Sequence, residues 1–514
     1  MDYSYPLLAS CERNLDRTAV ISGEQRISYC QLERDIAGLT AGLRALVSTG
    51  QRVASFLLSE PETLEFYMAL ARLGAVSVPV NTRLTVDEKR YILEDSGCTV
   101  LVVDNDFLDE AEQLRELIPT ISHVLSSRPS AYDDLVSLRS SAPEEAPTAW
   151  AGDESAACTI MYTSGTTGFP KGVVRSHRAN VWNAVNSALG SPSTAEDVVL
   201  FNLPIFGIGF LHFALPALLS GSTLVLDRVF HPKRVWELLE KHRVTLTFLA
   251  PTMIAAMLDV DDQSHVDVSA LRVIRTAYAF PERLRLRALD RFGDLFIHMY
   301  GLTEAQLTSA LPRQFADKPA NVGRAMGVMR LRVADKNGAR VPDGVVGEIL
   351  FEGPSIMTEY LNLSEQTRST VVDGWVRTGD IGLIDADGDL VYVGRLKEMI
   401  KTGGFSVDPI EVENAILRLD AVVEASALGV ADDQWGEMVV AFVAPAHNQT
   451  VTSDDIIEVC RQTIAGYKVP KKVFIVDELP KNATGKVERG VLRQWYSERS
   501  SSDGDREKES EAGR

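Results

Sequence analysis

Residues 162–172 read YTSGTTGFPKG, and this stretch indicates a strand that leads into an anion-binding loop. It holds four Ser/Thr hydroxyls, three glycines and one lysine within eleven positions. Glycine permits positive φ and close backbone approach, and N–H groups, hydroxyls and an ammonium are donors that phosphate oxygens accept from. The apolar run just before the loop, residues 158–162, predicts a buried strand. A phosphate-binding loop therefore explains these residues better than a Ser/Thr/Gly linker does.

The loop is not a Walker loop, and four further motifs accompany it. A Walker loop needs Gly-Lys-Ser/Thr at its end, whereas Lys171 lies between Pro170 and Gly172. Downstream, in order, stand YGLTE at 300–304, VRTGD at 376–380, GRLKEMIKTGG at 394–404 and PKNATGK at 480–486. Weaker matches are ISY at 27–29 and GAVSVP at 74–79.

These five ordered motifs resemble those of the adenylate-forming superfamily, which comprises acyl-CoA synthetases, peptide-synthetase adenylation domains and firefly luciferases. The resemblance covers roughly residues 10–495 and is greatest to the acyl- and aryl-CoA synthetases, which are AMP-forming acid–thiol ligases.

Composition bounds the function class. A net charge of −19 argues against a nucleic-acid partner and means that an anion such as ATP must be attracted locally. The five cysteines are scattered, odd in number and without CxxC spacing, which predicts a cytoplasmic protein with no disulfide frame and no zinc site. The N-terminus shows no signal-peptide pattern. The apolar stretch 209–226 contains His212, Pro216, Ser220 and Gly221, so we expect a buried helix and a strand rather than a membrane span.

The chain is too long for one core and is expected to form an α/β protein of several parts. Short apolar runs alternate with amphipathic stretches in the first three-quarters, which predicts layered, largely parallel sheets. Alternating segments at 330–335 and 347–352 predict a small β subdomain. We expect a large N-terminal domain over 1–394, a smaller α+β C-terminal domain over 395–498, and a disordered tail over 499–514. In the C-terminal domain, Ser453 is the expected N-cap of a helix that ends near Gly466.

A turn at 385–389, sequence DADGD, has too few ligands for a calcium loop.

The resemblance implies a set of ATP contacts. The loop residues Thr163, Ser164, Gly165, Thr166, Thr167, Gly168 and Lys171 match positions that hold the β- and γ-phosphates. Thr303 matches the hydroxyl that touches the α-phosphate, and Glu304 matches the acid that binds Mg²⁺, with Tyr300 in the same nucleotide-binding run. Asp380 matches the acceptor of both ribose hydroxyls, and Arg395 a second ribose or phosphate contact. Lys486 matches the lysine that bridges the incoming carboxylate and the α-phosphate.

The same resemblance implies a hinge at Lys397, about which a mobile C-terminal domain swings between two half-reactions. Lys401, Gly403 and Gly404 would then line the route of the acceptor thiol. The residues themselves show a charged junction flanked by glycine, which a hinge needs and which an ordinary linker also has.

The acyl pocket departs from the family pattern. Where many relatives have PxFH, this chain reads PIFG, so Gly207 replaces both that His and the Asp with which adenylation domains hold an α-amino group. A Gly-rich segment is replaced by TAYAFP at 276–281, and a Gln-Gly before the YGxTE motif by His298-Met299. The expected pocket residues are Phe206, Gly207, Ile208, Ala277, Tyr278, Met299 and Gly301, with Phe210 nearby. A zwitterion lacks a counter-ion here, so the sequence favours a bulky, largely apolar acid.

The leading interpretation is ATP- and Mg²⁺-dependent formation of acyl-AMP with release of pyrophosphate, followed by transfer to CoA. Alternatives are an enzyme that stops at the adenylate or loads a carrier protein, luciferase-like oxygenation, and a non-catalytic adenylate-binding protein. The last is disfavoured because Glu304, Asp380 and Lys486 are all retained. The sequence leaves open the acid, which could belong to fatty-acid or secondary metabolism, and the oligomeric state, including a homodimer.

Overall fold

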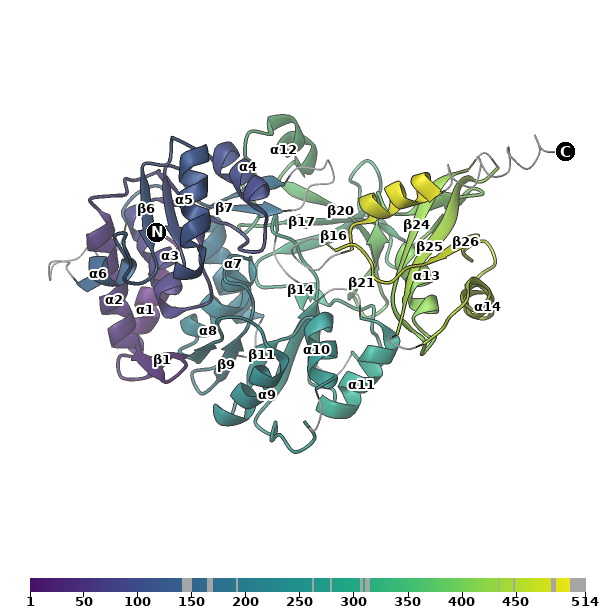
Figure 1. The fold of residues 1–514 in the computed structure, drawn as a ribbon, viewed down its shortest axis with the longest axis horizontal. Coiled ribbons are helices and arrows are strands. Elements are labelled where there is room, and N and C mark those ends of the chain that lie inside the picture. Colours follow the sequence, from purple (N-terminus) through teal and green to yellow (C-terminus); the bar gives the residue numbers. More distant parts are fainter. Residues whose placement is uncertain are drawn as a thin grey trace.

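The computed structural model describes residues 1–140, 150–163, 170–190, 193–260, 263–277, 280–305, 308–309, 315–432, 434–446, 449–481 and 487–499. It is a layered α/β protein, as the sequence predicts, with the N-terminal layers at one end and a separate C-terminal sheet at the other (Figure 1). Of the helices in these ranges, none is both long enough and apolar enough to cross a membrane.

The first large sheet has seven strands and is mostly parallel. Its order is β13 (Phe296–Met299), β12 (Val273–Ala277), β11 (Leu246–Phe248), β9 (Val198–Phe201), β10 (Thr223–Leu226), β1 (Thr18–Ser22) and β2 (Gln25–Ser28). Between its strands the chain forms α8 (Leu215–Leu219), α9 (Pro232–Lys241), α10 (Pro251–Leu258) and α11 (Glu282–Phe292). The apolar stretch 209–226 forms the π-helical turn η2 (Phe210–Ala214), then α8, then β10, which confirms the expected buried helix and strand.

The second large sheet also has seven strands. Its order is β18 (Glu359–Tyr360), β8 (Lys171–Ser176), β7 (Ala157–Thr163), β4 (Val76–Pro79), β3 (Arg52–Phe56), β5 (Val100–Val103) and β6 (His123–Ser126). The helices of this part are α1 (Tyr5–Arg13), α2 (Tyr29–Leu43), α3 (Pro61–Leu73), α4 (Val86–Ser96), α5 (Leu108–Leu117), α6 (Leu135–Ser140) and α7 (His177–Leu189), with the short 3₁₀ turn η1 (Asn105–Phe107).

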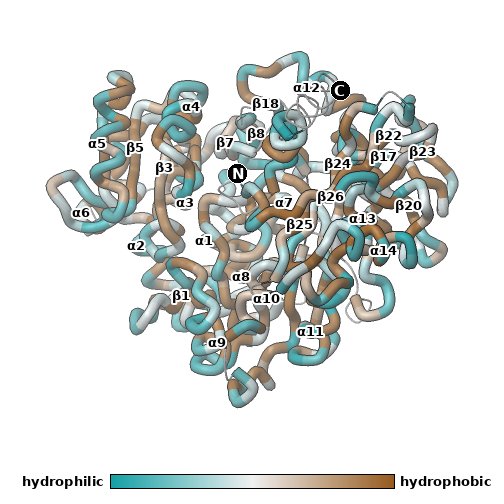
Figure 2. Tube along the Cα trace, turned by 45° about the vertical axis from the view of Figure 1, so that its right-hand side comes forward, coloured by the Kyte–Doolittle hydropathy of each residue, from teal (hydrophilic) through white to brown (hydrophobic). Residues whose placement is uncertain are grey.

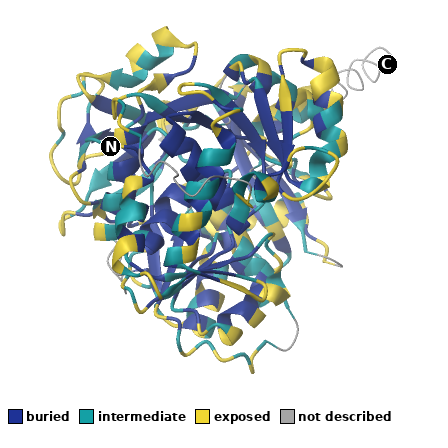
Figure 3. Ribbon diagram, turned by 90° about the vertical axis from the view of Figure 1, so that its left-hand side faces the viewer, coloured by how far each residue is buried: buried dark blue, intermediate teal, exposed yellow. Residues whose placement is uncertain are grey.

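One hydrophobic cluster spans both large sheets and the helices between them. It includes Val53 and Val102 from the second sheet, Phe201 and Leu224 from the first, and residues of α2, α3, α7 and α8. Figure 3 shows these strands and inner helices as buried, and Figure 2 shows hydrophobic residues along the same segments. Burial of apolar area is the main source of stability, so the two sheets form one rigid support.

A smaller antiparallel sheet follows. It comprises β16 (Arg330–Ala334), β17 (Gly347–Glu352), β20 (Trp375–Ile384) and β19 (Val371–Val372), with β21 (Leu390–Arg395) paired to β20. The predicted hairpin strands 330–335 and 347–352 are confirmed as β16 and β17. Nearby lie α12 (Ser364–Thr370) and the short ribbon of β14 (Thr308–Ser309) and β15 (Arg324–Ala325). In the turn at 385–389 the carboxylates are engaged by cations of the chain itself, because Lys318 pairs with Asp385 and Arg324 with Asp389.

The C-terminal unit has its own sheet and core. The sheet contains β23 (Phe405–Val407), β22 (Ile400–Thr402), β25 (Gly436–Pro445) and β24 (Val422–Asp432), with β26 (Lys472–Ile475) paired to β25. Helices α13 (Pro409–Ile416) and α14 (Ser453–Thr463) pack on it around a separate cluster. The expected N-cap at Ser453 is wrong by one residue, because Thr452 forms a capping box with Asp455. The expected end near Gly466 is also late, since Ile464 is the C-cap. The predicted tail lies, after Arg499, outside the described residues.

Candidate active site

The predicted phosphate loop connects two antiparallel neighbours, β7 and β8. Thr163, the last residue of β7, is paired in register with Lys171, the first residue of β8. Ser164, Gly165, Thr166, Thr167 and Gly168 lie between them, outside the described residues. Lys171 is buried, and burial lowers the pKa of its ammonium, with the positive charge of Lys397 acting in the same direction. Lys171 is thus a desolvated cation at the base of the loop, which is a favourable partner for an incoming anion.

The segment after β13 carries Thr303 and Glu304, and two residues that motif reasoning missed hold it in place. The hydroxyl of Tyr360 donates a hydrogen bond to Glu304 Oε1 at 2.7 Å, and the Lys171 ammonium lies 5.6 Å from the centre of the Tyr360 ring. The fully buried Arg175 of β8 donates to the carbonyl oxygens of Thr303 at 2.8 Å and of Ser355 at 3.0 Å. The available sequence signal for Arg175 was a basic residue directly after the apolar pair Val173-Val174 in β8.

Asp380 lies within β20, which continues to Ile384. Gly379 has a φ of +72°, and the pairing of β17 with β20 shifts register just before it, as at a β-bulge. The Asp380 carboxylate is nearly buried; it accepts from the Tyr300 hydroxyl at 2.6 Å and from Arg395 Nε at 2.9 Å. Burial raises the pKa of Asp380, and the Arg395 guanidinium opposes that shift. Tyr300, Asp380 and Arg395, which are far apart in sequence, therefore form one cluster.

The junction between the N-terminal layers and the C-terminal sheet follows β21. Gly394 and Arg395 end that strand, and Lys397 lies in an exposed turn before β22. The expected thiol-route residues lie just beyond: Lys401 is exposed on β22, and Gly403 and Gly404 form its turn to β23 with φ of +56° and +83°. Lys486 lies outside the described residues.

The expected acyl-pocket residues lie along the carboxyl ends of the first large sheet. Met299 on β13 is paired with Ala277 on β12, and Met299 belongs to the large hydrophobic cluster, against which Ala277 packs. Phe206, Gly207 and Ile208 follow β9 and are half-buried, as is Gly301. Tyr278 lies outside the described residues. The nearest atom to a Cβ built on Gly207 would be the Pro204 carbonyl oxygen at 3.5 Å, so this position tolerates a side chain locally.

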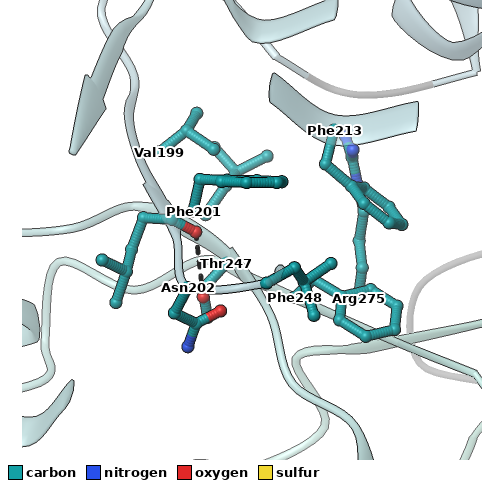
Figure 4. A pocket seen from close by; sticks show the side chains of 10 residues that line it. Val199, Phe201, Asn202, Phe213, Thr247, Phe248 and Arg275 are labelled. Carbon is teal, nitrogen blue, oxygen red and sulfur yellow. Dashed lines mark hydrogen bonds between the residues drawn. The ribbon is translucent and has the colours of Figure 1, made fainter. Parts of the chain in front are cut away.

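A cavity opens beside these residues (Figure 4). Its walls come from β9, β11, β12 and η2, and they include Val199, Phe213, Phe248 and two polar side chains, Asn202 and Arg275. None of the expected acyl-pocket residues that the structure describes is among those that line this cavity.

The residues present fit a magnesium ion that arrives with ATP. Within the described ranges no cluster of three or more His, Cys, Asp or Glu side chains could hold a metal on its own. Mg²⁺ usually takes one or two carboxylates and completes its octahedron with phosphate oxygens and water. Glu304, beside Lys171 and the phosphate loop, would supply that carboxylate.

The whole sequence was compared with known proteins. Residues 7–361 match the AMP-binding enzyme family, and residues 411–486 match the AMP-binding enzyme C-terminal domain. The chain is 35% identical over 487 residues to the indoleacetate–CoA ligase of Aromatoleum aromaticum, covering 93% of this chain and 95% of the relative. It is 36% identical over 484 residues to the feruloyl-CoA synthase of an Amycolatopsis species, with 93% and 96% covered. The crystal structure of ATP-bound MatB from Rhodopseudomonas palustris superposes with a TM-score of 0.86 at 29% identity, covering 96% and 99% of the two chains.

Proposed function

The chain belongs to the AMP-binding enzyme family, and on that premise we propose that it is an AMP-forming acid–thiol ligase. It activates a bulky, largely apolar carboxylic acid with ATP, releases pyrophosphate, and transfers the acyl group of the resulting acyl-AMP to CoA. The observation that carries the proposal is the meeting of Lys171 and Glu304, from two separate motifs, with Tyr360 of β18 at the end of the β7–β8 hairpin.

Adenylation requires a carboxylate to attack the α-phosphorus of ATP, so two anions must approach each other. The chain counters this repulsion locally, because its net charge of −19 offers no long-range attraction. Lys171 would neutralise the β- and γ-phosphates, with the loop 163–168 donating around them. Lys486 would lie between the carboxylate and the α-phosphate, and Arg175 fixes the backbone of Thr303 opposite them. Mg²⁺, bound through Glu304, would offset charge on the phosphate oxygens.

The ribose would bind at the Asp380 cluster. Tyr300 and Arg395 orient that carboxylate before the nucleotide arrives, which lowers the cost of ordering it on binding.

The acid would enter between β9, β12 and β13. No acidic side chain is at position 207 to hold an ammonium, and burying an unpaired ammonium is expensive. The pocket would therefore reject an α-amino acid. It would instead bind an acid that packs against Met299, Ile208 and Phe206.

The thiol step would use the C-terminal unit. Its exposed turn at Gly403–Gly404 lies against the ring of Trp435, since a Cβ on Gly403 would come within 3.1 Å of that ring. Phe405 beside the turn is 55% exposed and stacks on Tyr467 with ring centres 4.5 Å apart. Exposed aromatic rings beside a flexible turn suit a nucleotide-bearing thiol such as CoA. Rotation about Lys397 would bring this face to the adenylate.

The test is pyrophosphate release over a panel of acids with Mg²⁺ and ATP, with and without CoA, and mass spectrometry of the products. The proposal expects acyl-AMP without CoA and acyl-CoA with it. Adenylate with no thioester would restrict the enzyme to the first half-reaction, and no pyrophosphate with any acid would overturn the proposal. Replacing CoA with a carrier protein in the same assay tests whether a carrier protein accepts the acyl group. Light scattering of the same preparation tests whether the enzyme is a homodimer.

We further propose a cytoplasmic location. All five cysteines are free thiols, and four of them are buried, as suits a reducing compartment.

A further inference from the structure

The cavity in Figure 4 is walled by apolar side chains but contains polar groups that the protein leaves without partners. The free space here is small, about 10 Å³, which is room for a single water-sized group such as one ligand oxygen. Buried polar atoms are almost always hydrogen-bonded, so a group of unsatisfied ones indicates water or ligand atoms at that place. Asn202, which lines this cavity, and His212, next to the lining residue Phe213, have such atoms among the described residues, and Arg275 lines the cavity with one long hydrogen bond.

Arg275 is a buried cation with no ion-paired carboxylate among the described residues, although the charge of Asp197 acts on it from further away. Its side chain is on β12, extends along Phe213 (Figure 4), and the residue is only 6% exposed. Among the described residues, its side-chain contacts are a long hydrogen bond to Ser193 Oγ at 3.4 Å and the Phe213 ring, 5.5 Å away. Burial lowers the pKa of Arg275 to about 10, and it stays charged at neutral pH. A buried guanidinium without a counter-ion is costly to the fold, so its presence indicates a role outside stability.

His212 lies next to Phe213 on η2 and is 2% exposed. Neither of its ring nitrogens has a hydrogen-bond partner among the described residues. Burial lowers the pKa of His212 to about 3, and the Arg175 and Arg275 charges act in the same direction, so the ring is neutral at physiological pH. A neutral imidazole offers one donor and one acceptor.

Asn202 follows β9 and lines the cavity with both side-chain polar atoms buried and unpartnered. It adds a further donor, near the opposite wall from Arg275 (Figure 4).

The polar residues lie deep, away from the reacting end of the site. On β13, Met299 leads directly to Tyr300 and on to Thr303 and Glu304, and Met299 is paired with Ala277. Arg275 is paired with Ile297, two residues further down both strands. At about 3.3 Å per residue this places Arg275 roughly 7 Å below the Ala277–Met299 level. It lies on the same face of β12 as Ala277, since side chains alternate along a strand.

We propose that the acid taken by this chain carries a hydrogen-bond-accepting oxygen at the end remote from its reacting carboxyl, and that Arg275 binds this oxygen. Asn202, which lines the same cavity, adds a further polar group, and His212 lies next to Phe213 on η2. A second carboxylate satisfies Arg275 most fully, because charge-assisted hydrogen bonds are the stronger ones; a ring or chain carbonyl satisfies it in part. The inference rests on the proposed function and refines its acid from apolar to apolar with a distal acceptor.

The test uses matched acids on the full-length enzyme. One set is phenylpropanoate with hydrogen, an acetyl group or a carboxyl group in the para position. The other is octanoate, its terminal methyl ketone and octanedioate. In the unaltered enzyme, kcat/KM of the best acceptor-bearing acid exceeds that of its hydrocarbon analogue by about 10- to 100-fold, the range for a hydrogen bond to a charged group. The ketone and the diacid report separately on a neutral and an anionic acceptor.

Arg275→Met removes the guanidinium at similar volume and brings that ratio close to one, chiefly by raising KM for the acceptor-bearing acids. Arg275→Lys retains the charge and keeps part of the preference. The control is Arg287→Met, which removes an exposed guanidinium of α11 paired with Asp259 and leaves the ratio unchanged. In thermal unfolding without ligand, Arg275→Met is no less stable than the parent enzyme. Added diacid, without ATP or CoA, raises the melting temperature of the parent enzyme and not that of Arg275→Met.

A preference that survives Arg275→Met, or a parent enzyme that turns over the hydrocarbon acids at least as well in both sets, overturns the inference. In either case the hydrocarbon acids still report adenylation, so the proposed function stands. Absence of pyrophosphate with every acid instead overturns the proposed function itself. If Arg275→Met does not fold, the ratios of the parent and of Arg275→Lys decide the matter.

Discussion

The nucleotide end and the acid end of the proposed site differ in how the protein treats its own polar groups. At the nucleotide end, Asp380 already accepts from Tyr300 and Arg395, and Glu304 from Tyr360. At the acid end, Arg275 and His212 are buried with few or no partners among the described residues. The chain itself orders the polar side chains of the nucleotide end, whereas the polar side chains of the acid end would gain hydrogen-bond partners from the bound acid.

This difference matches what each end has to recognise. ATP is the same in every turnover and for every member of the family, so a fixed cluster that lowers ordering costs suits it. The acid differs among the relatives named above. Unsatisfied donors discriminate strongly, because an acid that lacks the matching oxygen leaves them unpaired.

The largest effect is expected at the nucleotide end, from Lys486→Ala. This change removes the charge proposed to lie between the carboxylate and the α-phosphate, and adenylation should fall by ~10²–10³-fold, as for the loss of one charge stabiliser. Pyrophosphate release under saturating acid and ATP measures it. Unchanged adenylation would refute the role given to Lys486.

The next largest effect is expected at the proposed hinge, and it distinguishes adenylate formation from the thioester step. Lys397→Pro restricts φ at the proposed hinge. Adenylate formation should largely survive, whereas thioester formation from supplied acyl-AMP should fall by about 10²-fold, as for a misplaced reacting group. Lys397→Ala is the matched control: it removes the same charge, retains backbone freedom, and should spare the thioester step more. Equal losses in both steps would count against a hinge here.

A smaller effect is expected when Glu304 loses the hydrogen bond from Tyr360. Tyr360→Phe removes the hydroxyl that donates to Glu304 and keeps the ring beside Lys171. A hydrogen bond to a charged group supports an expected loss of about tenfold or somewhat more in kcat/KM for ATP. A titration with Mg²⁺ should show a weaker apparent affinity. Wild-type Mg²⁺ dependence would show that Tyr360 does not orient Glu304.

The smallest effect is expected at the acid end. Gly207→His narrows the pocket, and KM should rise about fivefold for wide acids and least for short ones, since overpacking costs about 1 kcal/mol at the low end of its range and each 1.4 kcal/mol is tenfold. The backbone tolerates the change, because a Cβ there makes only ordinary contact with Pro204. KM values over acids of graded width provide the measurement. Indifference of the wide acids would remove Gly207 from the pocket wall.

Sequence motifs identified Tyr300, Glu304 and Asp380 because short local patterns carry them. They could not identify the partners: Tyr360 is 56 residues from Glu304, and Arg175 is 128 residues from Thr303. Those contacts depend on β8 and β18 lying together at one edge of a sheet, and pairing of strands far apart in sequence is not encoded locally. The helix cap was misplaced by one residue because Thr452 and Ser453 are both good caps, and only the reciprocal bond with Asp455 decides between them.

At the acid end, in contrast, the relevant residue is visible in the local sequence. Strand β12 reads VIRTA, with one basic residue in an apolar run. Gly207 in place of a His favours an apolar pocket, whereas Arg275 of β12 places a cation in the wall of the cavity between β9 and β12. The layered α/β fold, in contrast, follows from alternation summed over many segments and is robust to such single residues.

The C-terminal unit meets the N-terminal layers through ion pairs on the surface, Glu282–Arg418 at 3.3 Å and Arg283–Asp420 at 3.1 Å. Each side chain is at least half exposed, and such pairs contribute about 0–1 kcal/mol and weaken with salt. If the C-terminal unit swings about Lys397 as proposed, contacts of this strength would leave its two orientations close in free energy. A ligand that prefers one orientation by only a few kcal/mol would then set its population. The bound ligand would in that case decide whether the enzyme is arranged for adenylation or for thioester formation. The ionic strength of the medium would shift the equilibrium between these two orientations.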